Sequence, residues 1–539
     1  MLRKRLLNEL ERILKKDEFE WSVLVLDKIG QDVIAPLFRM SDLMEMGIVQ
    51  CLRLEEERPK VVEARAVYLV AETAENCGII AKDITGGWYR SVEVIFTGVV
   101  GRSEFESLAQ VVGAQGESRR VRRVMDGLVR LSMVSERFYS LNLEGSFMAG
   151  GEEVSAAIKL GILSLLRGLE NPVILSEAKY MGLGESIMNR AKELGVKGRP
   201  GKRSAAVVIL GREMDLITPV EHGWTYGSLV VDLLGYDLNK VTIPGKMVRT
   251  DGVSGGDEGS DVGEDKVFDL NRFDQFWAQN QNEYFPTVAE RVEQELGEYK
   301  ADLAQRSIDS SSSKETISQA LAQVPELSQK NKQIHTHMTI ALSLVEEIKK
   351  QKLDEIVGLE NDTSKIAEIK DELEDLLPKV SAENFLRALA VLTSRFPEES
   401  GYLEGLARKK GCAVEVLRFL AQSQEESTSE RRSIVSTAAT SLFRNIKRIL
   451  PLKKKMPITV AVQDILNRRT NYQAVELYPN QNLNYASVHV FMIGGGTFTE
   501  YKSLMELAEE TGIEITYGAT EILVPSKFLA RIAEILATK

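Results

Sequence analysis

Short apolar runs alternate with helical patterns along the first hundred residues, and this alternation is the strongest constraint on the fold. The runs VLVLD (23–27), AVYLVA (66–71) and VEVIFTG (92–98) are each followed by a stretch in which apolar residues recur at helical spacing. Strands that alternate with helices form parallel sheets through right-handed crossovers. We therefore predict a small doubly wound α/β domain over residues 1–116.

A second α/β domain is predicted to be discontinuous, with one part at 117–246 and the other at 466–539. Its expected helices cover 121–133 and 153–169. Its expected strands are PVIL (172–175), AAVVIL (205–210), SVHVFMIGGG (487–496) and IEITYG (513–518). The last two strands follow a long stretch with mostly helical patterns. We therefore predict that this stretch is an insertion in the domain.

The insertion, residues 247–465, is expected to be mostly helical. The segment 251–265 is rich in Gly, Ser and acidic residues and cannot bury a core, so we predict a disordered surface loop there. The break at 358–364 lies between two strongly charged helical patterns. It predicts the tip of a helical hairpin spanning about 326–378.

Composition excludes several classes of function. The formal net charge of the 539-residue chain is −11, so no overall positive field draws it to nucleic acid. The 3 cysteines lack the spacing of a zinc site and are expected to be reduced thiols. The basic N-terminal segment predicts an amphipathic helix, and no apolar run approaches the roughly 20 residues that span a bilayer. We expect no cofactor or metal, and contact with membranes mainly through partners.

The turn IGGGTFTEY (493–501) is the one candidate phosphate site. A strand, a glycine loop and a helix N-terminus can cradle a phosphate, but the third glycine of the dinucleotide fingerprint is absent after Gly494, Gly495 and Gly496. Glu514 lies at the distance of a ribose-binding acid but inside its strand. A tight structural turn is favoured, and an α/β enzyme that binds a nucleotide or sugar phosphate there is the alternative.

Three other features each allow a structural and a functional interpretation. His335 and His337 would point about 200° apart on a helix, which disfavours a shared metal ion. His489 lies within a predicted strand and is interpreted as a core histidine. The basic stretch 443–457 is interpreted as a solvated linker, with contact to anionic lipid as the alternative.

The segment 211–234, GREMDLITPVEHGWTYGSLVVDLL, joins a predicted strand to a predicted helix through a polar loop. One hypothesis makes His222 a catalytic base oriented by Asp215. The other treats the polar residues as a hydrogen-bonded brace, because buried polar groups in a loop need partners. The candidate brace comprises Arg212, Asp215, Pro219, His222, Thr225 and Tyr226.

This loop resembles the signature of the SM (Sec/Munc) family, cytosolic regulators that bind SNARE proteins in vesicle fusion. The departure is Gly211, where the family usually has Asp. The stretches 274–302 and 324–354 are similar to the Sly-one branch, which serves traffic from the endoplasmic reticulum to the Golgi. The matching loop positions are Leu210, Arg212, Asp215, Pro219, His222, Thr225, Tyr226, Asp232 and Leu233.

The resemblance implies a three-domain arch without enzymatic activity. The helical insertion would comprise domain 3a (247–378), on which SNARE helices are aligned, and domain 3b (379–465). The first domain would bind an N-terminal peptide of a Qa-SNARE of the syntaxin-five or Sed-five type. For any single residue of this implied peptide pocket, the alternative is that it only packs on the sheet. The implied pocket comprises Phe105, Leu108, Ala109, Val112 and Val121.

The implied mechanism is templating, in which the protein holds SNARE motifs in register and lowers the entropic cost of nucleating their coiled coil. The expected partners are the Qa-SNARE, assembled SNARE bundles and tethering factors, with no nucleic acid. The chain alone is expected to be a monomer, cytoplasmic and peripherally associated with endoplasmic reticulum and Golgi membranes.

Overall fold

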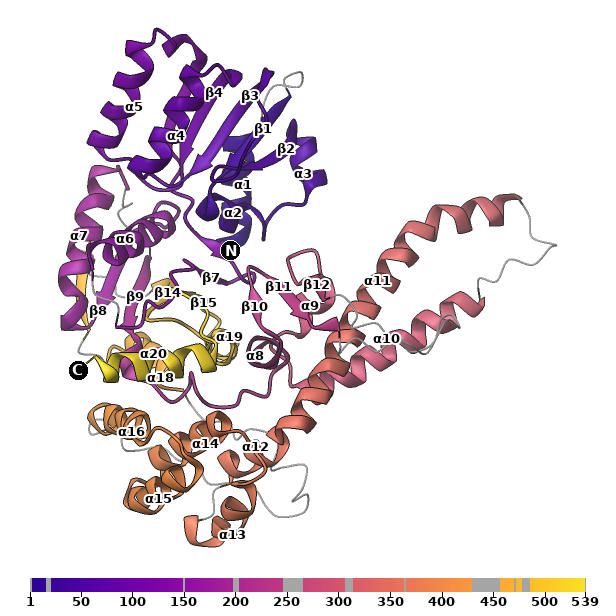
Figure 1. Ribbon diagram of the computed structural model, residues 1–539, viewed down its shortest axis with the longest axis vertical. Coiled ribbons are helices and arrows are strands. Elements are labelled where there is room, and N and C mark those ends of the chain that lie inside the picture. The colour runs from indigo at the N-terminus through magenta and orange to yellow at the C-terminus, as the bar shows by residue number, and fades with distance from the viewer. Residues whose placement is uncertain are drawn as a thin grey trace. The chain divides into compact units, whose positions relative to one another are not determined.

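The computed structural model describes residues 2–15, 21–148, 151–196, 203–245, 265–305, 314–362, 365–428, 456–469, 472–476 and 485–538. These residues form two compact units (Figure 1). Unit 1 comprises Met1–Arg212, Ile458–Gly496 and Leu504–Ile522, and unit 2 comprises Glu213–Pro457, Thr497–Ser503 and Leu523–Lys539. These two units differ from the three predicted domains, and the division into three domains stays a prediction.

Unit 1 contains a fully parallel five-stranded sheet in the order β2-β1-β3-β4-β5. This is a doubly wound order, so the predicted α/β class is confirmed. The strands are β1 (Ser22–Leu26), β2 (Ile48–Arg53), β3 (Val61–Val70), β4 (Tyr89–Phe96) and β5 (Val121–Asp126). The helices around them are α1 (Leu2–Leu14), α2 (Lys28–Ile34), α3 (Met40–Glu45), α4 (Ala74–Thr85) and α5 (Arg102–Ala114).

Helices cover both faces of this sheet, which is why its strands read as continuous apolar runs. Val23 and Val25 of β1 pack in one core cluster with residues of α4 and α5. Leu24 and Leu26 point the other way and pack in a second cluster with α1 and α2. Figure 1 shows α4 and α5 side by side along the first face.

The prediction of a helix over 121–133 is wrong. Val121, Val124 and Leu128 have helical spacing, but the chain is extended there and β5 pairs with β4. Leu128 then takes a left-handed backbone conformation with φ of 51°. The first sheet therefore continues past the predicted boundary at 116, and β5 is its edge strand.

A seven-stranded sheet, also in unit 1, has the order β13-β8-β9-β14-β15-β7-β6. Its five central strands are parallel, and β13 and β6 pair antiparallel at the two edges. Pairing of β9 with β14 joins segments far apart in sequence, as predicted. The strands are β6 (Ser132–Met133), β7 (Phe138–Ser140), β8 (Pro172–Ser176), β9 (Ser204–Gly211), β13 (Gln473–Glu476), β14 (Tyr485–Ile493) and β15 (Glu514–Ala519).

Five further helices precede, connect or follow the strands of this sheet in the sequence. Side chains of α6 and α7 pack with Ile174, Val207 and Phe491 of the sheet in one core cluster. The helix predicted over 153–169 and the last helix predicted after Pro525 are confirmed. Their bounds are α6 (Glu152–Leu166), α7 (Met181–Glu193), α18 (Pro457–Leu466), α19 (Phe498–Thr511) and α20 (Pro525–Ala537).

Unit 2 is mostly helical, as predicted for the insertion. Besides α20, its described helices include α8 (Tyr226–Leu229), α9 (Gln275–Asn280), α10 (Phe285–Gln305), α11 (Lys314–Gln351), α12 (Leu353–Asn361), α13 (Ile366–Leu376), α14 (Ala382–Arg395), α15 (Ser400–Lys410) and α16 (Val414–Thr428). A small antiparallel sheet, which was not predicted, comprises β10 (Tyr236–Asp237), β11 (Lys240–Ile243) and β12 (Lys266–Asp269).

The helical hairpin predicted over 326–378 is placed differently in the structure. The two long helices that pack together are α10 and α11 (Figure 1). The helix that contains 326 ends at Gln351, Lys352 is left-handed with φ of 59°, and α12 continues to Asn361. A break does occur at the predicted tip, since α12 ends at Asn361 and α13 (Ile366–Leu376) follows it, but the two helices that meet there are short.

Two predicted segments lie almost wholly outside the described residues, namely the loop 251–265 and the basic stretch 443–457. Within the described part of the chain, no helix combines the length and the apolar character needed to cross a membrane.

Candidate functional site

The polar loop begins directly after β9 with Arg212, which is fully buried. Its Nη1 donates to the carbonyl oxygen of Gly495 at 3.4 Å. Asp215 turns back on its own loop and accepts from the N–H groups of Ile217 and Thr218, both at 3.0 Å. This is the way a short acidic side chain stabilises a tight turn. Asp215 therefore does not orient His222, and the hypothesis of a catalytic pair is wrong.

His222 pairs instead with Glu360, which lies on α12. The Nδ1 atom of His222 is 2.6 Å from Oε1 of Glu360, and the backbone N–H of His222 donates to Oε2 at 3.2 Å. Both side chains are only 2% exposed, so the pair is shielded from water. Sequence reasoning missed this partner because it lies 138 residues further along the chain.

Arg387 of α14 makes a second connection to the loop. Its Nε donates to the carbonyl oxygen of Val220 at 2.8 Å. Its two terminal nitrogens donate to the two carboxylate oxygens of Asp232, at 3.0 and 2.6 Å. A bidentate arginine–carboxylate pair is among the strongest polar contacts in proteins. Asp232 was one of the matching positions of the loop, and this contact gives it a structural role.

A third connection runs from Tyr226 to α11. The Tyr226 hydroxyl is 2.9 Å from Nδ1 of His337, and Nε2 of His337 is 2.9 Å from both carboxylate oxygens of Asp274. Burial raises the pKa of Tyr226, so its hydroxyl stays protonated and donates to His337. Burial alone would raise the pKa of Asp274, but hydrogen bonds from His337, Trp277 and Gln333 lower it.

A Tyr–His–Asp chain has the order of an acid–base relay, but its burial favours a structural role. Tyr226 is 0% and His337 1% exposed, so a substrate has no approach to the hydroxyl. Thr225 accepts from the N–H of Ser228 at 3.3 Å as the N-cap of α8, and Pro219 is buried. Together the contacts tie the loop to α11, α12 and α14 of unit 2.

The residues of the implied peptide pocket divide into two groups. Leu108 and Val112 are 6% and 4% exposed and pack in the core between α5 and the sheet. Phe105 is 43% exposed on the outer side of α5, and Ala109 is exposed one turn further on. Val121 is partly buried against the same core. Phe105, Ala109 and part of Val121 are therefore at the surface, whereas Leu108 and Val112 pack α5 on the sheet.

The glycine turn after β14 is packed on all sides. Gly494 and Gly495 have φ of 93° and 97°, which favours glycine. The N–H of Gly494 donates to Oγ1 of Thr520 at 3.0 Å, and the N–H of Gly496 to the carbonyl of Glu521 at 2.9 Å. These donors are therefore not available to a phosphate.

The other residues of the phosphate and metal alternatives, Glu514, His335 and His337, do not form a site either. Glu514 pairs in register with Ser487 at the start of β14, so it lies at the other end of the strands from the glycine turn. His335 is exposed, whereas His337 is buried in the contact with Asp274, so their rings face different surroundings.

Comparison with known proteins identifies the family. The Sec1 family model matches residues 22–531. The chain belongs to the Sec1 family. This confirms the resemblance seen in the polar loop, since the SM family is the Sec1 family under another name.

Several Sec1 family relatives match over nearly their whole length. The SEC1 family transport protein SLY1 of Encephalitozoon cuniculi is 31% identical, covering 99% of each chain. Protein SLY1 of Saccharomyces cerevisiae is 25% identical, covering 98% of this chain and 92% of the relative. A crystal structure of Sly1p in complex with an N-terminal peptide of Sed5p matches with a TM-score of 0.82 and 22% identity, over 100% of this chain and 99% of the other. The fold is that of the Sec1 family.

Proposed function

We propose that this chain is a regulator of SNARE-mediated vesicle fusion between the endoplasmic reticulum and the Golgi. The observation that carries the proposal is the match to SLY1 of Encephalitozoon cuniculi over 99% of both chains. Because the similarity covers nearly the whole of both chains, we infer the same domain architecture for this chain. The protein would act from the cytoplasmic side and associate with these membranes peripherally, through its partners.

Its main partner would be a Qa-SNARE of the syntaxin-five or Sed-five type. The similar Sly1p structure holds an N-terminal peptide of Sed5p, which supports this choice. On this chain, the proposed peptide contacts are Phe105, Ala109 and Val121. Assembled SNARE bundles and tethering factors would be further partners.

The proposed mechanism is binding without catalysis. The long helices α10 and α11 would hold SNARE helices in register, and alignment lowers the entropic cost of starting a four-helix coiled coil. The connections of His222, Val220 and Tyr226 to α12, α14 and α11 support a rigid template, because every one of them is buried. A rigid template binds its partners more tightly, because fewer of its own groups lose conformational freedom on binding.

Calorimetry with the N-terminal peptide of the organism's syntaxin-five type Qa-SNARE tests the proposed partner. We expect saturable binding at one site, and about tenfold weaker binding for Phe105→Ala, because burying an exposed aromatic side chain contributes roughly 1.5–3 kcal/mol. Val111→Ala is the matched control, since Val111 is 44% exposed on the same helix but outside the proposed contacts. Absence of binding, or equal loss in both variants, would contradict the assignment.

A further inference from the structure

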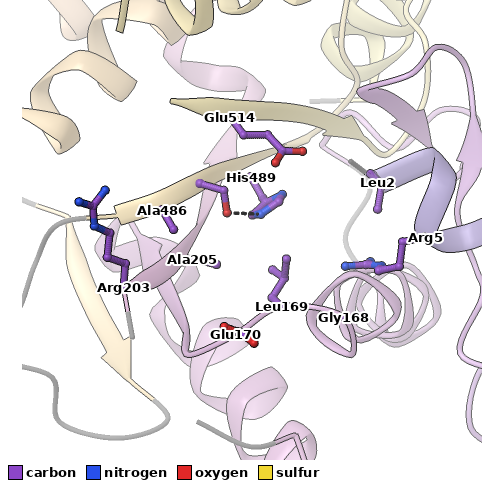
Figure 2. Close-up of a pocket in the computed structure, with 11 residues that line it drawn as sticks. Leu2, Arg5, Gly168, Leu169, Glu170, Arg203, Ala205, Ala486, His489 and Glu514 are labelled. Carbon is purple, nitrogen blue, oxygen red and sulfur yellow. Dashed lines mark hydrogen bonds between the residues drawn. The ribbon is translucent and has the colours of Figure 1, made fainter. Parts of the chain in front are cut away.

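A cavity of about 440 Å³ opens at the amino-terminal ends of β9, β14 and β15 in the seven-stranded sheet (Figure 2). Its charged lining residues are two arginines and two glutamates, which alternate around it in the view of Figure 2: Arg5, Glu170, Arg203 and Glu514. His489 adds no charge, because burial, helped by the positive charge of Arg5, lowers its pKa to about 3. The charges of this cavity therefore balance one another, and its lining favours a ligand of neither sign.

The surface at the amino-terminal ends of β3, β4 and β5 has a different charge distribution. Three segments meet there, namely RPKVVE (58–63), KDITGGWYR (82–90) and ESRRVR (117–122). They are neighbours because β4 pairs with β3 on one side and with β5 on the other. Together they hold seven basic and three acidic residues, although the whole chain has a net charge of −11. We call the surface formed by these three segments the basic face.

Trp88 lies on the basic face and is partly exposed. The Cζ atom of Arg58 is 5.3 Å from the centroid of its ring, and the Nζ atom of Lys60 is 5.6 Å from it. Cations at this distance are attracted to the face of an indole ring. The backbone N–H of Val61 donates to the carbonyl oxygen of Trp88 at 3.0 Å, and the next residue, Val62, is 54% exposed. The basic face therefore presents apolar as well as basic side chains to solvent.

Two arginines of the basic face are neutralised within the protein. Arg58 is buried, and its Nη1 donates to Oδ2 of Asp83 at 2.8 Å. Arg120 donates through Nε to Oε2 of Glu117 at 2.6 Å and through Nη1 to the carbonyl oxygen of Tyr89 at 3.0 Å. These contacts hold the turn before β4 and the start of β5 together, and they occupy two of the three acidic residues.

Three other bases of this face, Lys60, Lys82 and Arg119, are exposed. None of them forms an ion pair with another residue that the structure describes. Glu63 is the exposed acid of the three segments. The surface of the basic face therefore keeps a positive excess that the protein does not compensate.

We propose that the basic face binds anionic phospholipid membranes directly and reversibly. Lys60, Lys82 and Arg119 contact lipid phosphates, and Trp88 and Val62 lie among the headgroups. Basic side chains are attracted to anionic lipids, and tryptophan is favoured at the boundary between headgroups and acyl chains. A membrane fits this face better than a soluble acidic segment does, because it meets bases on three separate segments at once and also accepts the apolar side chains. This contact is additional to the association through partners proposed above and does not depend on SNARE binding.

Cosedimentation of the full chain with vesicles of phosphatidylserine and phosphatidylcholine tests the proposal. We expect binding that weakens as the salt concentration rises, and little binding to phosphatidylcholine alone. Lys60→Gln, Lys82→Gln and Arg119→Gln should each weaken binding about fivefold, the contribution of one exposed base near an anionic surface. Lys192→Gln is the matched control, since Lys192 is exposed on α7 outside the basic face. Phe105→Ala should also leave vesicle binding unchanged, which separates this proposal from that of the SNARE peptide.

Tryptophan fluorescence with brominated phospholipids shows whether this face touches the membrane. Trp224 and Trp277 are buried, so the variant Trp21→Phe keeps Trp88 as its one partly exposed tryptophan. We expect brominated vesicles to quench part of the emission of this variant, and the additional substitution Trp88→Phe to abolish the quenching.

The proposal is overturned if the chain does not bind anionic vesicles, or if all three glutamine variants bind as the unmodified chain does. Quenching that survives Trp88→Phe would also overturn it, because another surface would then face the lipid. Binding of soluble polyglutamate as tight as binding of the vesicles would contradict it as well, and would favour an acidic protein segment as the partner.

Discussion

At the scale of single residues, the buried contact between His222 and Glu360 can be tested directly. His222→Ala removes the partner of a carboxylate that is 2% exposed. An unpaired buried charge costs more than the lost contact itself, so we expect a loss of about 2–4 kcal/mol in the free energy of unfolding, measured by urea titration. His335→Ala, at an exposed histidine on α11, should change it by less than about 0.5 kcal/mol. Equal stability of the two variants would refute the proposed brace.

His489 predicts a dependence of stability on pH. Its pKa is about 3 in the folded chain and 6.5 as the ordinary value. Below pH 6.5 the unfolded chain binds a proton that the folded chain does not, so stability falls as pH decreases. Between pH 7 and pH 5 this single group should cost about 2 kcal/mol.

Comparison with His489→Gln isolates this effect from other titrating groups. The free energy of unfolding of the unmodified chain, minus that of the variant, should decrease as the pH falls from 7 to 5. A difference that is constant over this range would show that His489 is not held neutral.

Sequence patterns located the important positions but not their contacts. Helical spacing grouped Leu108 and Val112 with Phe105, but the packing of α5 on the sheet separates them, because the first two are core and the third is exposed. The loop residue His222 was identified as structurally important, but its partner Glu360 is selected by tertiary packing that no local pattern encodes.

At the scale of elements, strands buried on both faces were predicted well because a continuous apolar run has few alternatives. The edge strand β5 was missed because Val121 and Val124 imitate helical spacing and three of its other four positions are polar or charged. The hairpin was misplaced because charge density marks solvent exposure without marking a turn. The further break at Lys352, which ends α11, depends on one left-handed residue and has no signature in composition.

The exposed face of α11 gives a prediction for this element. Leu342 is 42% exposed on a helix whose other described leucine, Leu344, is buried. Under the templating proposal, Leu342→Asp should slow SNARE assembly several-fold and leave unfolding unchanged. Glu346→Asp, one turn further along the exposed side, should leave the assembly rate unchanged. Slowing by both substitutions, or by neither, would argue against a contact at Leu342.

At the scale of the whole molecule, pairing between distant strands was predictable because strands appear at both ends of a helical stretch. The structure pairs β9 with β14 in this way. The division into compact units was not predictable, because unit 2 takes in Thr497–Ser503 and Leu523–Lys539 from the end of the chain. Such grouping depends on which helix faces meet.

Under the proposed mechanism, the protein accelerates SNARE assembly by binding alone. Its most direct test is the rate of assembly of four fluorescently labelled SNARE motifs, measured by energy transfer with increasing amounts of the full chain and no added nucleotide. We expect acceleration that saturates near one chain per Qa-SNARE. An unchanged rate, or acceleration that requires a nucleotide, would contradict it.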